Sequence, residues 1–177
     1  MIAMKKLIFT TVLVSLFTIQ TTSSQMGRFQ KYSLSESEVP ESVLISQKEN
    51  FPTGFVTNWF QYSNFPSPNE NSSYYISSFQ KQGTNSFKAY FNAEGELISK
   101  VTFLPTFALP EVIQEGVHNS HLNTRIKSGD LIRIYDLNLE IYRVRINTEG
   151  LLQYVYYDKY ARMLDGNRLP VEVLSLN

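Results

Sequence analysis

The 177-residue sequence has no cysteine, only two histidines and only one tryptophan. The absence of cysteine excludes disulfides, thiol catalysis, zinc sites built on thiolates and a lipid anchor attached to a cysteine. Stability must therefore come from a packed core. The 12 phenylalanines and 11 tyrosines are numerous enough to supply one.

An excess of charge of one sign is also missing, because 16 basic residues balance 16 acidic ones. Proteins that bind nucleic acid or anionic membranes usually carry a basic excess or a basic stripe. The composition therefore argues against nucleic acid as a partner.

No apolar run reaches the roughly 20 residues that a membrane-spanning helix needs. The longest one, residues 7–17 (LIFTTVLVSLF), follows Lys5 and Lys6 and precedes TTSSQ, which is the pattern of a signal peptide. We expect cleavage between Ser24 and Gln25, export to the periplasm or beyond, and no stable membrane insertion afterwards. A retained anchor is the less favoured alternative. The exported chain would keep 14 of the 16 basic residues against 16 acidic ones.

Two helices are predicted directly after prolines. Proline suits the first turn of a helix, and Val39-Pro40 and Leu109-Pro110 each precede a one-sided apolar pattern. The first helix is expected over about 40–50 and ends near Phe51-Pro52. The resulting divisions are a signal peptide over 1–24, a leader segment without clear pattern over 25–38, and two repeated units over 39–108 and 109–177.

Short aromatic and β-branched segments between turn residues predict four strands in each unit. They lie at 58–62, 74–79, 87–91 and 96–103, and at 124–127, 131–136, 141–146 and 151–158. The predicted fold class is α+β, with two tandem helix-plus-four-strand units and both helices on one face of an antiparallel sheet.

Two similar turns, FNAEGELI at 91–98 and INTEGLLQ at 146–153, are interpreted as marks of this duplication. Asparagine and glycine favour tight hairpin turns. The alignment equates Asn92 with Asn147 and Leu97 with Leu152, and places both leucines in the core.

Strand alternation predicts which residues share a face. The face under the helices is expected to contain Phe87, Ala89, Phe91, Leu97, Tyr142, Val144, Ile146 and Leu152, with Trp59 packed in the core between the layers. The opposite face is expected to be open and to carry a partner-binding surface of Lys88, Tyr90, Lys100, Arg143, Arg145 and Tyr157, beside Ile98, Ile141 and Gln153. Tyrosine and arginine are frequent interface anchors, although an ordinary solvated sheet face has a similar composition.

The ordered set of features resembles the PepSY-like, β-lactamase-inhibitor-like exported proteins of Bacteroidetes. It comprises the signal peptide, the Xaa-Pro helix starts, Phe51-Pro52, Trp59 and the hairpin AYFNAEGEL, over residues 39–160. The resemblance implies helices covering one face of an antiparallel sheet, and a periplasmic or secreted module that binds a protein or peptide, with inhibition as one form of binding. Shared architecture does not carry inhibition with it.

Catalytic and metal sites find little support. His118 and His121 with Glu115 could share a helix face, but three ligands without cysteine or further histidine make a weak zinc site. No GxSxG motif is present. The carboxylate pairs Glu94 with Glu149 and Asp158 with Asp165 lie in turns or near the chain end. We therefore expect a non-enzymatic protein with no catalytic residues, cofactor or metal; the alternative is a small-ligand or metal carrier with a pocket between helix and sheet.

Overall fold

The computed structural model describes residues 28–65, 73–81, 86–170 and 173. The expected signal peptide and its cleavage site lie outside these residues. The described chain is α+β and forms a single antiparallel sheet in which each strand pairs with the next one along the sequence. The strands are β1 (Arg28–Leu34), β2 (Phe55–Phe65), β3 (Ser73–Gln80), β4 (Ser86–Phe91), β5 (Leu97–Pro105), β6 (Thr124–Ile134), β7 (Leu139–Thr148), β8 (Leu151–Asp158) and β9 (Met163–Leu164).

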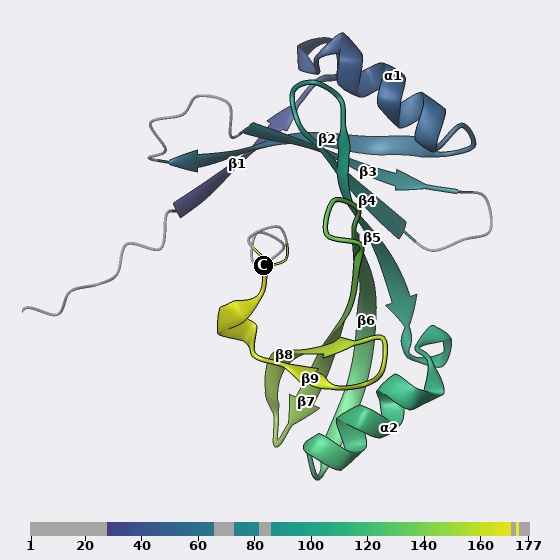
Figure 1. The fold of residues 1–177 in the computed structure, drawn as a ribbon, viewed down its shortest axis with the longest axis vertical. Coiled ribbons are helices and arrows are strands. Elements are labelled where there is room, and N and C mark those ends of the chain that lie inside the picture. Colours follow the sequence, from purple (N-terminus) through teal and green to yellow (C-terminus); the bar gives the residue numbers. More distant parts are fainter. Residues whose placement is uncertain (1–27, 66–72, 82–85, 171–172, 174–177) are drawn as a thin grey trace, which may run out of the picture.

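Two helices, α1 (Glu41–Asn50) and α2 (Glu111–Ser120), pack on the same face of this sheet, as predicted (Figure 1). Pro40 and Pro110 precede them, where the missing N–H of proline costs no helical hydrogen bond. We call the face under the helices the outer face. The sheet twists and curls away from them, so its other side, the inner face, faces the C-terminal segment.

The outer face holds two separate cores, one under each helix. Under α1, Val43, Phe51, Trp59 and Phe79 are buried together, which confirms Trp59 as a core residue. Gln47 is buried there too, and its Oε1 accepts a 2.6 Å hydrogen bond from Ser77 Oγ. The core under α2 is more uniformly apolar, with Leu109, Ile113, Val117, Ile126, Val144, Ile146 and Tyr157.

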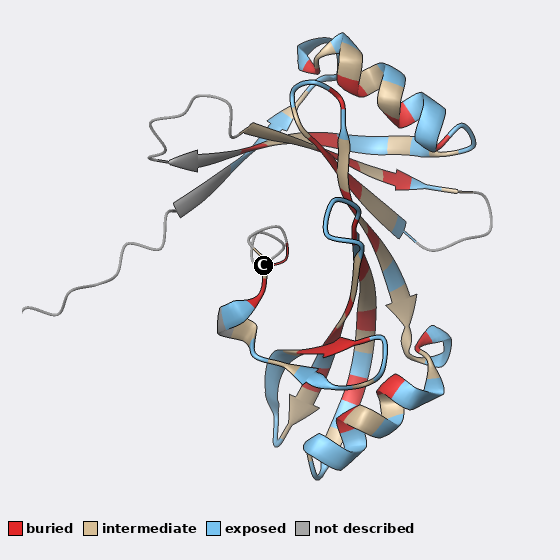
Figure 2. Cartoon of the chain, in the orientation of Figure 1, coloured by how far each residue is buried: buried red, intermediate tan, exposed pale blue. Residues whose placement is uncertain are grey.

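A third core lies on the inner face, opposite α1 and α2 (Figure 2). Side chains from β2 to β8 form it, and Leu169 and Val173 of the C-terminal segment cover it. Its sheet residues are Tyr62, Ile76, Tyr90, Val101, Ile132, Ile134, Ile141 and Tyr156. The predicted open face is therefore closed over its centre by the chain itself.

The two helical regions match closely in backbone geometry. A 3-10 turn precedes each helix, at Glu36–Glu38 and Thr106–Ala108. The strand after each helix has an irregularity in its pairing, between Val56 and Asn58 in β2 and between Ile126 and Ser128 in β6.

The strand assignments beyond this point differ from the prediction. Residues 124–127 and 131–136, expected as two strands, form the single strand β6, while β1 lies within the expected leader segment.

The two similar turns therefore occupy non-corresponding hairpins. NAEG joins β4 to β5, the third hairpin after α1, whereas NTEG joins β7 to β8, the second hairpin after α2. The equation of Leu97 with Leu152 is wrong. Leu97 packs against the α1 core, but Leu152 pairs with Asn147 and is 53% exposed.

The physical reason is the length of the connection. Phe91 pairs with Leu97, whereas Ile146 pairs with Gln153, one residue beyond Leu152. Because side chains alternate along a strand, that single residue moves Leu152 to the opposite face. The faces of β8 are therefore reversed with respect to the prediction.

Candidate functional site

The six residues of the predicted binding surface divide between the two faces of the sheet. Lys88, Tyr90, Arg143 and Arg145 lie on the inner face, where Tyr90 belongs to the core and Lys88 pairs with Val101 of that core. Lys100 and Tyr157 lie on the outer face and are corrected below.

Lys100 is displaced by an irregularity in the pairing of β4 with β5. Tyr90 pairs with Ser99 and Phe91 with Leu97, so Ile98 is an extra residue that shifts the alternation by one. Lys100 then pairs with Ala89 of the α1 core, and its Nζ lies 5.0 Å from the centroid of the Phe87 ring. It is an outer-face cation, and it takes no part in an inner-face site.

Tyr157 is displaced by the reversal of β8. Its side chain is fully buried under α2, and its hydroxyl lies 3.5 Å from the Gly116 carbonyl oxygen, which it can use as an acceptor. Burial raises the pKa of this hydroxyl. Tyr157 is therefore a core residue with its polar end at α2, and it is not available to a partner.

Two inner-face residues of the predicted surface are also buried. Tyr90 is 6% exposed, and burial, the largest cause, raises the pKa of its hydroxyl strongly. Arg143 is 7% exposed, and its Nη2 and Nε donate to Asp130 Oδ2 at 2.8 and 3.0 Å. Its guanidinium carbon lies 4.9 Å from the centroid of the Tyr154 ring. Arg143 is thus one half of a fixed ion pair rather than a free anchor.

Next to this ion pair the inner face is exposed. Arg145 of β7 pairs with Tyr154 of β8, and Phe103 of β5 lies on the same face, where it pairs with Asp130 of β6. We define the inner strip as Phe103, Arg145, Leu152 and Tyr154; Phe103 is 41%, Leu152 53% and Tyr154 45% exposed, and Arg145 is also exposed. Among these, only Arg145 was predicted from the sequence.

A cavity of about 430 Å³ opens beside the inner strip. Phe103 and the Arg143–Asp130 pair form one side, and Lys88 contributes an amino group. The further lining residues are Thr57, Ser78, Phe79, Gln80, Ser86, Phe87 and Val101. We refer to this cavity as the inner pocket. It combines apolar walls with a small number of hydrogen-bonding and charged groups, as ligand sites commonly do.

A second lysine extends the positive charge across the inner face. Lys31 of β1 pairs with Tyr62, and its Nζ lies 3.8 Å above the Phe60 ring. Burial, and secondly the positive charge of Lys88, lower the pKa of Lys31. The contribution of Lys88 to this shift indicates that the positive charges of Lys31 and Lys88 repel each other on the same face.

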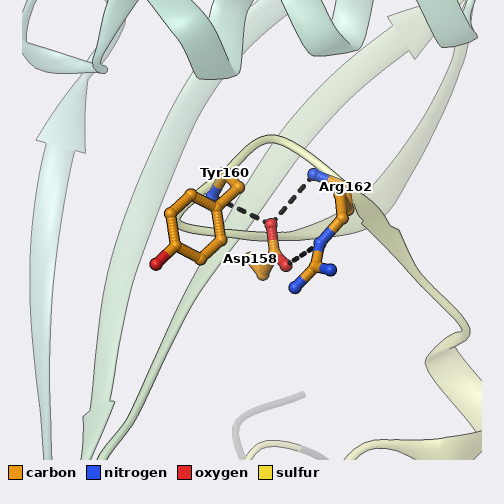
Figure 3. A network of polar contacts seen from close by, with 3 residues as sticks. All are labelled: Asp158, Tyr160 and Arg162. Carbon is orange, nitrogen blue, oxygen red and sulfur yellow. Dashed lines mark hydrogen bonds and ion pairs between the residues drawn. The ribbon is translucent and has the colours of Figure 1, made fainter.

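The carboxylates considered as catalytic pairs have structural roles or lie in solvent. Asp158 accepts hydrogen bonds from the Tyr160 and Arg162 backbone N–H groups, both at 2.9 Å, and from Arg162 Nε at 2.6 Å (Figure 3). Burial alone would raise the pKa of Asp158, but the hydrogen bonds from Arg162 and Tyr160 outweigh it and the pKa is lowered. Asp165 forms a 3.5 Å ion pair with Arg168.

Glu94 and Glu149 are exposed turn residues of two different hairpins.

His118 is exposed at the end of α2, and His121 follows the helix with its Nε2 buried and without a hydrogen bond inside the described structure. Over the described residues, no three His, Asp or Glu side chains are grouped to hold a metal ion. In that same part of the chain, no helix is both long and apolar enough to cross a membrane.

Comparison with solved structures shows a shared fold. A DUF2874 family protein of Bacteroides ovatus superposes with a TM-score of 0.57 at 16% identity, covering 71% of this chain and 84% of that one. A Bacteroides eggerthii protein provisionally assigned to the periplasm gives 0.58 at 16%, covering 72% and 86%.

A BLIP-like protein of Bacteroides fragilis gives a TM-score of 0.56 at 16% identity, covering 71% of this chain and 84% of that one. The sequence matches no protein-family model and no curated protein. The likeness therefore shows that the chain has the fold of these BLIP-like and DUF2874 Bacteroides proteins, as the sequence resemblance led us to expect.

Proposed function

We propose that the protein is an exported, non-enzymatic binding protein whose inner face engages another protein or a peptide in the periplasm or outside the cell. The observation that carries the proposal is the inner strip, where two aromatic rings, a leucine and an arginine are exposed on one face of the sheet. Tyrosine and arginine are enriched in the energetic centres of protein interfaces. Inhibition of the partner is one form that this binding can take.

The strip is exposed although the neighbouring part of the same face is closed by Leu169 and Val173. The chain thus covers the apolar centre of its inner face and leaves uncovered a margin of mixed aromatic, aliphatic and cationic character. The buried Arg143–Asp130 pair holds β6 and β7 together directly beside this margin. A rigid base of this kind reduces the ordering cost of binding.

Support for export comes from the signal-peptide pattern at residues 1–24 and from the provisional periplasmic assignment of a protein with the same fold. The proposal of a non-enzymatic protein is supported by the ion pairs that Asp158 and Asp165 form with Arg162 and Arg168. It is also supported by the positions of Glu94 and Glu149 in two different hairpins.

The test replaces Arg145 and Tyr154 together by alanine. Both side chains are exposed, so the free energy of unfolding should change by no more than about 0.5 kcal/mol at Arg145. At Tyr154 it should fall by about 1 kcal/mol, because the ring also contacts the Arg143 guanidinium. We expect the double variant, used as bait in periplasmic extract, to lose the proteins that the wild type retains. The measurement is quantitative mass spectrometry of the retained proteins, together with thermal unfolding of each bait.

The matched control replaces Arg133 and Tyr160, an exposed arginine and an exposed tyrosine outside the inner strip. Arg133 lies beside Lys100 on the outer face, and Tyr160 lies between β8 and β9. The control should retain the same proteins as the wild type. Equal retention by both double variants would reject the inner strip as the interface.

A second candidate function is transport of a small ligand. A cavity of about 430 Å³ lies between α1 and β2, with Leu44, Phe51 and Trp59 among its lining residues. This is the helix-to-sheet position expected of a carrier. Native mass spectrometry of the protein purified from its own host would reveal an added mass, and Leu44→Trp should remove that mass by filling the cavity.

A further inference from the structure

The inner face is positively charged although the whole chain is neutral. Its acidic residues, Asp130 and Asp158, are each bound to an arginine, Arg143 and Arg162. Its remaining cations are Lys31, Lys88 and Arg145, and none of these three has a carboxylate within ion-pair distance in the described structure. Because the whole chain has 16 basic and 16 acidic residues, the excess of positive charge is local to the inner face.

From this charge pattern we propose that the partner presents an acidic peptide segment, one carboxylate of which enters the inner pocket beside Lys88. The proposal rests on the proposed binding function and specifies the chemistry of its partner. A positive surface favours a negative partner through complementary potentials, which raise the association rate and suppress wrong partners.

The inner pocket is suited to a carboxylate on a short apolar stem. Its lining residues include Lys88, whose ammonium group can pair with a carboxylate, and Ser78 and Ser86, whose hydroxyl groups can donate further hydrogen bonds. Val101 and Phe103 supply the apolar part of the lining. Asp130 forms its ion pair with Arg143 and not with Lys88 in the described structure, so its negative charge is already balanced.

Lys31 adds a second cation to the inner face. Its positive charge lies on the same face, and the charge of Lys88 contributes to lowering the pKa of Lys31. A carboxylate bound beside Lys88 would reduce this repulsion between like charges. The free protein therefore holds two cations in a mutually unfavourable arrangement that a negative ligand improves.

The extent of the surface favours a peptide over a small anion. The inner pocket begins at β3 and β4, and the inner strip continues through Phe103 of β5 to Tyr154 of β8. A small anion could occupy the pocket alone and would leave the aromatic residues of the strip uncovered. An extended segment can place a carboxylate in the pocket and apolar side chains on Phe103, Leu152 and Tyr154.

The experiment selects binders from a displayed library of random short peptides, using the exported chain from Gln25 to Asn177 as bait. Parallel selections use Lys88→Gln, Lys88→Arg and the control Lys48→Gln, which removes an exposed lysine on α1. We expect Asp and Glu to be enriched with the wild type, Lys88→Arg and Lys48→Gln, and not with Lys88→Gln. The affinity of an enriched peptide should fall roughly tenfold or more in Lys88→Gln, the effect of losing one charge-assisted hydrogen bond.

A second measurement uses the wild type alone, so a folding defect in a variant cannot affect its result. The affinity for an enriched acidic peptide should weaken as NaCl is raised, because the attraction is screened. Salt-independent affinity, or equal acidic enrichment with Lys88→Gln, would overturn the inference.

The two levels of the proposal fail differently. Enriched peptides without acidic residues that still lose binding when Arg145 and Tyr154 are replaced would overturn the acidic partner and keep the inner-face function. Enriched peptides whose binding is unchanged when Arg145 and Tyr154 are replaced, or the absence of any enriched peptide, would overturn both the acidic partner and the inner-face function.

Discussion

At the scale of single residues, the inner face shows how pairing changes what a charged side chain can do. Arg143 and Arg145 are two residues apart on one strand and face the same way, yet the first is buried against Asp130 and the second is exposed. Replacing Arg143 would leave the partly buried Asp130 carboxylate without its ion-pair partner, which costs several kcal/mol. Arg143 is therefore unsuitable for testing an interface, whereas Arg145 is suitable.

Asp158 is the residue for which a pH dependence can be predicted. We expect Asp158→Asn to lower the free energy of unfolding by about 1–2 kcal/mol at pH 7, because it weakens hydrogen bonds to a charged acceptor, one of them from the exposed Arg162. The folded-state pKa of Asp158 lies below its unfolded value. The contribution is therefore fully present above the unfolded pKa of about 4 and is lost as the pH falls through the folded value.

The measurement is chemical denaturation of wild type and variant from pH 7 to pH 3. The control is Glu140→Gln, which removes an ion pair with Arg133 whose carboxylate is more exposed than that of Asp158 and should cost less than about 1 kcal/mol. A difference between wild type and Asp158→Asn that grows toward low pH would contradict the assignment.

At the scale of elements, the two glycine turns show that similar sequences can meet different surroundings. Both Gly95 and Gly150 have positive φ, +88° and +91°. The turn of Gly95 docks on the start of α1, where Ser42 Oγ donates to the Ala93 carbonyl oxygen at 2.9 Å. Gly150 has no other atom within 4 Å of where a Cβ would be, so its turn projects freely.

This contrast predicts unequal costs for the same substitution. Gly150→Ala should lower the free energy of unfolding by about 1–2 kcal/mol, the cost of the left-handed backbone. Gly95→Ala should cost about 1–3 kcal/mol more, because its Cβ would lie 2.6 Å from the Ser42 carbonyl oxygen. Denaturant unfolding of the two variants tests this directly. Equal losses in the free energy of unfolding would show that the Gly95 turn does not pack tightly against α1.

The existence of the elements was largely predictable, and their pairing was not. Proline before each helix and the alternation of residues 87–91 and 141–146 indicated α1, α2, β4 and β7. The union of 124–127 with 131–136 in one strand was missed because Ser128 and Gly129 look like a break. Gly129 instead lies against Leu109, which leaves no room for a Cβ.

At the scale of the whole molecule, the decisive feature is the C-terminal segment on the inner face. Backbone pairing to the sheet ends at Leu164 of β9 within the described residues, and beyond it Leu169 and Val173 are buried among side chains of the sheet. The segment thus behaves as part of the core. It also determines how much of the inner face a partner can reach.

We expect Leu169→Ala to destabilise the protein by about 2–3 kcal/mol, the lower part of the range for truncating a buried leucine. The double variant with Val173→Ala should lose more and should also bind more of the dye ANS, because the inner-face core becomes exposed. Arg168→Ala, which alters a highly exposed neighbour, is the control and should change little. Unchanged stability of the double variant would mean that the segment does not close the inner face in solution.

The components were readable from the amino-acid sequence: a chain without disulfides, two helices that begin after prolines, aromatic strands of an antiparallel sheet, and Trp59 in the core. These follow from local backbone preferences and from alternation within one strand, which need no distant contact. The face on which Lys100, Leu152 and Tyr157 lie became clear from the folded chain alone, because one extra residue in a hairpin or bulge reverses every later position in the strand. The folded chain alone also showed that the inner face is closed at its centre and open at the inner strip, because Leu169 and Val173 reach that face through contacts between residues far apart in the sequence.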